Sequence, residues 1–140
     1  FTQTYNRTMP LVYSGQEEPV LRAVSFFEKD SMEFNKYERA SFYSTLLHLR
    51  STNAAFKENA VFERLSVNNP TQTMAYSRKN VDHLVVVVLN LSDKQADVKI
   101  DASLPKGHTY FEVFTHQAIK DIHSLSLPAW GYKVFVYGTK

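Results

Sequence analysis

Two adjacent carboxylates, Glu17 and Glu18, are the side chains of this sequence that come nearest to an acid–base pair. They follow Gly15 at the end of a short apolar run, and enzymes built on barrels keep functional groups at such strand ends. Neighbouring residues of an extended chain point to opposite faces, so these two carboxylates cannot act as one catalytic pair. We therefore predict no catalytic residue here. Glu17 is a candidate for lining a ligand cleft, but we favour an interpretation in which Glu17 orders the loop by accepting backbone N–H groups and Glu18 faces solvent.

Three further side chains are candidates for contacting a ligand. Arg22 supplies a charge, and Phe26, with Phe27 beside it, supplies an aromatic surface on which an apolar ligand face could pack. Trp130, the only tryptophan, precedes Gly131 and offers a second such surface. For the aromatic residues we favour structural roles: the phenylalanines cover an apolar surface that this chain lacks, and Trp130 packs in the core or in a turn.

Metal and cofactor chemistry has little support in the sequence. Asp30, Glu33 and Asn35 supply oxygen atoms but lack the spacing of a calcium-binding loop. The five histidines have no paired spacing of the HExxH kind, no cysteine is present, and no serine lies in a G-x-S-x-G motif. We therefore predict no metal site and no cofactor.

The composition is that of a globular chain without an electrostatic preference for a partner. Of the 140 residues, 44% are hydrophobic, which suits one core with at most a small appendage. Sixteen basic and fourteen acidic residues leave a net charge of +2, with the two signs interspersed. The longest apolar run, 84–89, is too short for a membrane helix. We expect a soluble chain that binds neither nucleic acid nor membrane. The sequence does not indicate its cellular compartment.

One amphipathic helix is predicted from Tyr37 to about Asn53. Asn35 and Glu38 have the spacing of a capping box, in which the first side chain accepts an N–H group of the helix and the second reaches back. Beyond them one stripe of residues recurs at steps of three and four, so one face of the helix must dock on a partner surface. The stripe consists of Ala40, Tyr43, Leu46, Leu47 and Arg50.

After Asn59 the hydrophobic period changes from helical to alternating, which predicts strands. The run 84–89 is apolar on both faces, as a strand buried between two layers must be, so a strand from His83 to Asn90 is expected at the centre. Several short strands between turns favour a mostly β fold, an antiparallel β-sandwich with Greek-key-like order. The other expected strands are Thr73 to Arg78, Ala96 to Ile100, Tyr110 to Phe114 and Tyr132 to Tyr137.

The first part of the chain reads as strand, long loop and helix. Met9 to Tyr13 is a short apolar run that predicts a strand, but a parallel strand needs neighbours that this segment does not have. We therefore divide the chain into residues 1–57, a unit without its surroundings, and residues 58–140, the β-sandwich. Residues 1–35 are expected to be poorly ordered, folded back on the sandwich, or buried against another copy of the chain.

Several motifs, in their order and spacing, resemble the C-terminal part of the α-amylase family of glycoside hydrolases. Residues 10–17 (PLVYSGQE) look like the last barrel strand and its loop, written G-x-P-x-x-Y-x-G-x-E. Residues 25–34 look like the loop FF-x-K-D-x-I-x-W, and residues 42–56 look like the last barrel helix. Residues 85–92 (VVVVLNLS) and 127–132 (LPAWGY) are similar to strands of the family's C-terminal sandwich.

This resemblance implies a parent enzyme that is a retaining hydrolase or transglycosylase of α-linked glucose polymers, with a (β/α)8 barrel followed by the sandwich. The family's catalytic Asp, Glu and Asp would all lie before Phe1. Because a complete barrel needs about 250 residues, we expect a C-terminal fragment: the last strand, loop and helix of the barrel, then the sandwich. The fragment alone is expected to be inactive. Its expected partners are the missing barrel and the α-glucan substrate of the parent.

The leading hypothesis is thus a structural domain that stabilises the barrel through the predicted helix, with Glu17, Arg22 and Phe26 at most lining the rim of a glucan cleft. The alternative is a carbohydrate-binding β-sandwich that uses Trp130 and Tyr132 as exposed rings. A third hypothesis is a free-standing structural sandwich. Self-association of the fragment through its uncovered surface is a further expectation.

Overall fold

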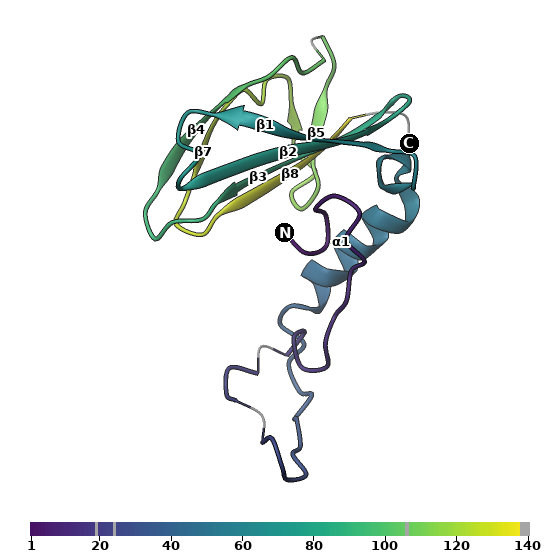
Figure 1. Cartoon of the computed structure of the whole chain (residues 1–140), viewed down its shortest axis with the longest axis vertical. Coiled ribbons are helices and arrows are strands. Elements are labelled where there is room, and N and C mark those ends of the chain that lie inside the picture. Colours follow the sequence, from purple (N-terminus) through teal and green to yellow (C-terminus); the bar gives the residue numbers. More distant parts are fainter. Residues whose placement is uncertain (19, 24, 106, 138–140) are drawn as a thin grey trace.

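The computed structural model describes residues 1–18, 20–23, 25–105 and 107–137. Within these residues, eight strands form one sheet in the order β6-β5-β8-β3-β2-β1-β4-β7, and every neighbouring pair is antiparallel (Figure 1). A helix, α1 (Ala40–Thr52), and a short 3-10 helix, η1 (Ala54–Phe56), precede them. The strands are β1 (Val61–Val67), β2 (Thr73–Asn80), β3 (His83–Asn90), β4 (Ala96–Asp101), β5 (Tyr110–Glu112), β6 (Ala118–Ile119), β7 (Ser124–Leu127) and β8 (Tyr132–Tyr137).

The sheet curls into two layers because β1 changes its partner along its length. Residues 61–65 pair with β2, whereas Ser66 and Val67 pair with β4. Strands β4 and β7 thereby cover one face of the other strands, which confirms the predicted antiparallel β-sandwich. The core between the layers includes Val98, Ile100 and Leu127 from β4 and β7, and Leu65, Ala75, Val86, Val88 and Phe135 from the strands that they cover.

Strand β3 lies at the centre of the molecule and is buried on both faces, as its sequence predicts. Successive side chains of a strand point to opposite faces. Val86 and Val88 therefore belong to the core between the layers, whereas Val85 and Val87 belong to a second core on the opposite face. Helix α1 and η1 cover that second face, to which they contribute Leu46, Ala55 and Phe56.

Helix α1 confirms the predicted helix but begins at Ala40, later than expected, and the predicted capping box is absent. Arg39 occupies the N-cap position without a side-chain hydrogen bond, and Tyr37 has a left-handed φ of 52°, so the chain before Ala40 is not helical. The side chain of Asn35 bonds to Glu33 instead of to the helix. Among the described residues, no helix combines the length and the apolar character needed to cross a membrane.

The hairpin of β2 and β3 closes through Val81 and Asp82, and Val81 has a positive φ of 51°. Strands β3 and β8 have the bounds that the sequence predicts, and β2 is longer by two residues. Strand β5 stops at Glu112, before the predicted Phe114, because the buried Glu112 carboxylate accepts the backbone N–H groups of Phe114 and Thr115 and turns the chain. Strands β1, β6 and β7 were not predicted individually.

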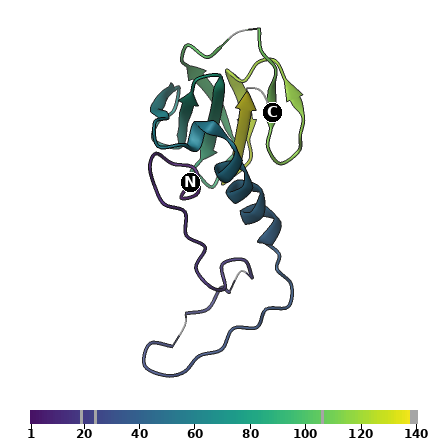
Figure 2. The same ribbon diagram turned by 90° about the vertical axis from the view of Figure 1, so that its right-hand side faces the viewer.

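The N-terminal segment contains no strand among its described residues, so the strand predicted over Met9 to Tyr13 is wrong. The apolar run is present, but no neighbouring strand offers it a hydrogen-bonded ladder. Residues 1–8 fold back on the sandwich, where the Thr4 and Tyr76 hydroxyl oxygens lie 2.7 Å apart and the Tyr5 ring packs edge-on against Phe62. The described part of 9–37 instead extends away from the sandwich (Figures 1 and 2).

Tyr76, beneath this folded-back segment, makes the fold sensitive to alkali. Its side chain is fully buried, and burial raises the pKa of its hydroxyl to about 12 even though the hydrogen bond with Thr4 opposes the shift. The folded state therefore keeps a proton that the unfolded chain releases near pH 10, so stability present below pH ~10 is lost between pH ~10 and ~12. We expect the free energy of unfolding to fall more steeply over that range in the parent chain than in Tyr76→Phe, as measured by urea unfolding at each pH. Equal slopes for the two proteins would contradict the assignment.

Candidate functional site

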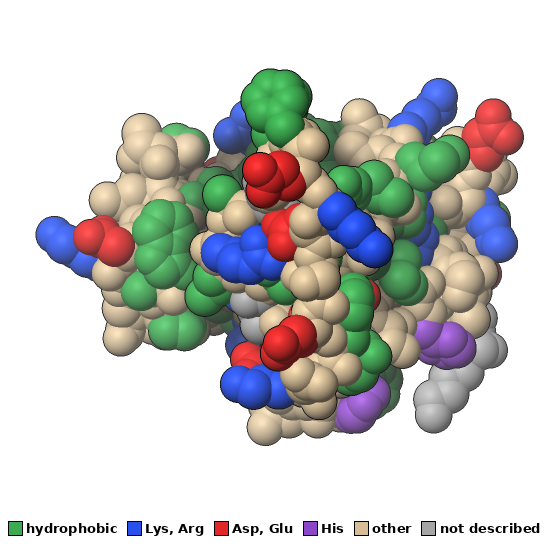
Figure 3. Space-filling view, turned by 90° about the horizontal axis from the view of Figure 1, so that it is seen from below, with side chains coloured by type: hydrophobic (Ala, Val, Ile, Leu, Met, Phe, Trp, Pro, Cys, Tyr) green, Lys and Arg blue, Asp and Glu red, His purple; other side chains and the backbone are tan. Residues whose placement is uncertain are grey.

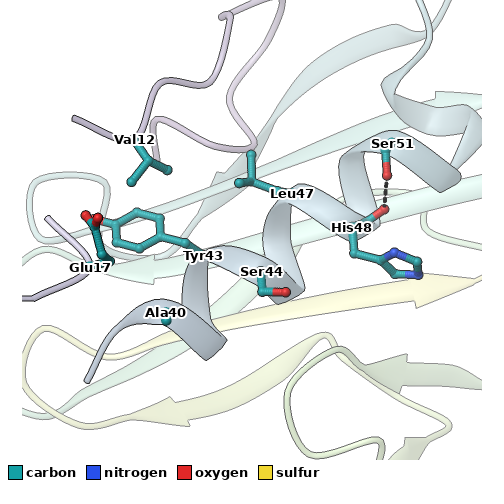
Figure 4. A pocket seen from close by; sticks show the side chains of 8 residues that line it. All are labelled: Val12, Glu17, Ala40, Tyr43, Ser44, Leu47, His48 and Ser51. Atoms are coloured by element: carbon teal, nitrogen blue, oxygen red, sulfur yellow. Dashed lines mark hydrogen bonds between the residues drawn. The ribbon is translucent and has the colours of Figure 1, made fainter. Parts of the chain in front are cut away.

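The outer face of α1, turned away from the sandwich, borders an open hollow of about 640 Å³ (Figure 4). The inner face carries Leu46, which is 3% exposed, whereas Leu47 on the outer face is 37% exposed. The predicted single stripe therefore divides between two faces of the helix. The hollow is lined by Val12 and Glu17 from the N-terminal segment and by Ala40, Tyr43, Ser44, Leu47, His48 and Ser51 from α1.

Glu17 is the acidic group of this hollow and lies beside the Tyr43 ring, near the N-terminal end of α1 (Figure 4). Its backbone oxygen accepts the N–H group of Arg39 at 3.0 Å. Its Oε2 atom is buried and has no hydrogen-bond partner among the described residues. A buried carboxylate oxygen costs free energy unless a donor satisfies it. Because the chain's own atoms shield this oxygen from solvent, a donor from outside the chain could reach it only if the loop around Glu17 moved.

Glu18 has the loop-ordering role that the sequence analysis gave to Glu17, so that assignment is corrected. Its carboxylate accepts the backbone N–H groups of Asn35 and Tyr37, each at 2.8 Å, and also that of Lys36. Partial burial acts to raise the pKa of Glu18, but these N–H donors outweigh it and hold the pKa below its ordinary value. Glu18 thus fixes the approach to α1 from seventeen residues away, which no local motif encodes.

Arg22 is engaged within its own loop. Its guanidinium donates to both carboxylate oxygens of Asp30, at 2.6 and 2.7 Å, and to the backbone oxygen of Ser31 at 2.7 Å. Asp30 also accepts the backbone N–H group of Ser25, and the bond to Arg22 is the main reason why its pKa lies far below the usual range. Asp30, considered above as a metal ligand, therefore forms with Arg22 a clasp at the base of the loop.

The clasp between Arg22 and Asp30 presents Phe26 and Phe27 at the surface. Their side chains are 89% and 94% exposed, and their rings meet edge to face with centroids 4.8 Å apart. In the view from below, hydrophobic side chains lie among acidic and basic ones over the projecting part of the molecule (Figure 3). Leu21 and Met9, also in the N-terminal segment, are 87% and 90% exposed. The uncovered apolar surface thus extends along this segment.

Trp130 lies in the turn between β7 and β8, apart from the hollow of Glu17. Its side chain is 66% exposed, so the predicted packing of Trp130 in the core is wrong, and the residue lies in a turn with most of its ring in solvent. It borders a smaller hollow of about 180 Å³ that Tyr132 and Leu91 also line. The structure therefore does not bring the four candidates Glu17, Arg22, Phe26 and Trp130 to one site.

Asn90, the last residue of β3, bonds to the turn of Trp130 and was not identified from the sequence. It is 2% exposed, and its Oδ1 atom accepts from the backbone N–H of Ser92 at 3.1 Å, which is an Asx-turn. The sequence Asn-Leu-Ser directly after an apolar strand is the signal that could have identified it. Within the described residues, no three His, Asp or Glu side chains lie close enough together to hold a metal ion.

A known family of protein domains matches part of the chain. Residues 62–134, just over half of the chain, match the model described as the maltogenic amylase C-terminal domain. No curated protein sequence matches the chain.

Solved structures of amylases share the fold at low sequence identity. The maltogenic α-amylase AmyB of Thermotoga neapolitana superposes with a TM-score of 0.82 at 17% identity, covering 99% of this chain and 35% of that one. An Anoxybacillus α-amylase gives 0.64 at 18% identity, covering 78% and 24%. The trehalose-6-phosphate hydrolase of Bacillus licheniformis gives 0.59 at 12% identity, covering 75% and 21%. The chain therefore spans about a third of the length of AmyB, and less of the other two.

Proposed function

Since this chain belongs to the family of maltogenic amylase C-terminal domains, we propose that it is a non-catalytic domain that stabilises the catalytic barrel of an α-glucan-cleaving enzyme. The outer face of α1 is the surface that makes the contact. The inner face of the same helix is already used, because Leu46 packs in the core that it shares with β3 and β8. One helix thus links the sandwich to a partner on its other side.

The observation that carries this proposal is the uncovered apolar character of the outer face. Leu47 and Tyr43 border the hollow of about 640 Å³, and the unpartnered Oε2 of Glu17 lies in the same place. Large apolar patches on a soluble domain mark surfaces that another body covers. A covering surface that brings an apolar side chain toward Leu47 would remove this apolar face from water.

The catalytic part of the proposal is that this domain cleaves nothing by itself. A retaining glycosidase needs two carboxyl groups about 5 to 5.5 Å apart on either side of the sugar. Glu18 is occupied by three backbone N–H groups and Asp30 by Arg22, so neither of these two carboxylates is free to act with Glu17 as a catalytic pair. We expect the isolated chain to release no reducing ends from amylose or maltoheptaose. Activity that survives purification and is lost on Glu17→Gln would overturn this part.

The docking part is tested by Leu47→Glu in the complete gene product and in the isolated chain. In the complete protein a charge at this face should lower the temperature of half-inactivation by several degrees, because it would be buried without a partner. In the isolated chain, where Leu47 is 37% exposed, the same change should alter the free energy of unfolding by less than about 1 kcal/mol.

The matched control for Leu47→Glu is Ser41→Glu, at an exposed position of the same helix that does not border the hollow. It should leave the stability of both proteins nearly unchanged. If Leu47→Glu and Ser41→Glu behave alike in the complete protein, the outer face of α1 is not the contact. A dimer of the isolated chain that Leu47→Glu dissociates would show that another copy covers this face, which also contradicts the proposal.

A further inference from the structure

We propose that Trp130 is the stacking platform of a carbohydrate-binding site on the sandwich, and that its ligand is an α-glucan chain. The platform does not depend on a barrel and goes beyond the stabilising role. Only the choice of α-linked glucose as the ligand rests on the proposed function.

Trp130 has a left-handed backbone with a φ of 55°. For a bulky residue this conformation is unfavourable, and it persists only where the surrounding structure determines it. Gly131 cannot exchange places with Trp130, because a Cβ atom on Gly131 would lie 2.7 Å from the Pro128 ring and 2.8 Å from the Pro128 oxygen. Glycine is the residue best suited to a left-handed position. The turn therefore carries a tryptophan where glycine would remove a backbone cost. Because Tyr37 and Val81 share this conformation, it is the exposure of the Trp130 ring together with the conformation, and not the φ alone, that points to binding.

A buried network holds the turn in this shape. The Nδ2 group of Asn90 donates to the backbone oxygens of Lys94 and Pro128, each at 2.7 Å. The backbone N–H of Trp130 donates to the oxygen of Ser92 at 2.9 Å, and the backbone N–H of Asn90 donates to the oxygen of Gly131 at 2.8 Å. Two neighbouring turns, 91–95 and 128–131, are thereby fixed to each other, and so is the backbone from which the indole ring projects.

The groups around the ring suit a sugar. The Trp130 side chain is 66% exposed, and the hollow beside it is bordered by Tyr132, itself 42% exposed. An amphipathic ring with one open side can accept the C–H face of a pyranose, as apolar sites with a few polar groups accept ligands generally. Asp93 and Lys94 follow Ser92 and are exposed, so the turn bonded to Trp130 carries an acceptor and a donor for sugar hydroxyls.

The test uses the single tryptophan as the reporter. Titration of the whole chain with maltoheptaose should give a saturable change in tryptophan emission, and cellohexaose of similar length should give a weaker one. The variants, which change or remove the reporter, are compared by isothermal titration calorimetry. Trp130→Gly should lose about tenfold or more in affinity for maltoheptaose. Phe111→Ala, at an exposed aromatic residue of β5 that does not border this hollow, should bind like the parent chain.

The same variant separates a binding role from a structural one. If Trp130 is present for binding, Trp130→Gly should fold and melt at the same or a higher temperature, because glycine removes the cost of the left-handed backbone. A lower melting temperature together with unchanged affinity would mean that the ring only packs, and the proposal would be wrong. The proposal would also be wrong if millimolar maltoheptaose gave no saturable response. It would be wrong as well if the emission changed when the chain was concentrated without sugar and sedimentation showed that the change reflects self-association.

Discussion

Replacing Leu46 by alanine is expected to lower the free energy of unfolding by about 2–5 kcal/mol. Leu46 is 3% exposed and lies in the core shared by α1, η1 and the central strands, next to Val87 and Val134. Removal of its side chain leaves a cavity between a helix and a sheet that cannot close without moving the helix. Equilibrium unfolding in urea, followed by far-ultraviolet circular dichroism, measures the loss.

Leu47→Ala is the matched control, since it removes the same atoms from the next position of the same helix. Leu47 is 37% exposed, so its replacement should cost less than about 1 kcal/mol in the isolated chain. Both leucines belong to the single stripe that the sequence predicts, and the structure separates them because only Leu46 is buried. Equal losses for the two variants would show that the helix buries both side chains and that its outer face is not free.

Phe135→Ala is expected to cost about 3–5 kcal/mol, the range for a large ring removed from a core. Phe135 is fully buried on β8, where its backbone pairs with Val86 on one side and Glu112 on the other. Its side chain lies in the core between the two layers, with Leu127 and Val98 of the covering strands. The loss therefore reports whether β4 and β7 close over the sheet, and chemical unfolding measures it.

Phe111 on the neighbouring strand β5 provides the comparison. It is 46% exposed and pairs with Val136, one residue along β8 from Phe135. Phe111→Ala should cost about 1 kcal/mol or less because much of the ring is already in water. If Phe135→Ala and Phe111→Ala lowered the free energy of unfolding equally, Phe135 would not lie in a core covered by β4 and β7.

The parts of the fold that a local pattern encodes could be predicted. The run 84–89 has no polar face, so its position between two cores follows from the sequence alone. Strand β7 has only four residues, and β6 has two, too few for an alternation to be distinguished from a loop. Strand β1 is missed for another reason: its burial pattern is irregular where it passes from one layer to the other.

The parts of the candidate site that depend on distant partners could not be predicted. Glu18 caps the approach to α1 across a long loop, whereas Asn35 and Glu38 satisfy the local pattern of a cap without forming one. Arg78 is similar: it is 4% exposed in β2, its Nε group donates to the oxygen of Ala55 at 2.8 Å, and its guanidinium lies 5.0 Å from the Phe56 ring centroid. From the sequence alone, an arginine in a strand predicts a side chain that faces solvent. Only the structure shows that η1 covers this one.

The clasp between Arg22 and Asp30 bears on how quickly and how tightly the loop could meet a partner. A flexible loop loses conformational entropy when it binds a partner, and that loss lowers the affinity. Here the two ends of the segment are joined by paired charged hydrogen bonds beforehand, so Phe26 and Phe27 arrive in one arrangement. Part of the ordering cost of binding a partner would thus be met during folding of the chain itself, which would favour assembly by rigid-body collision over a slow search among loop conformers.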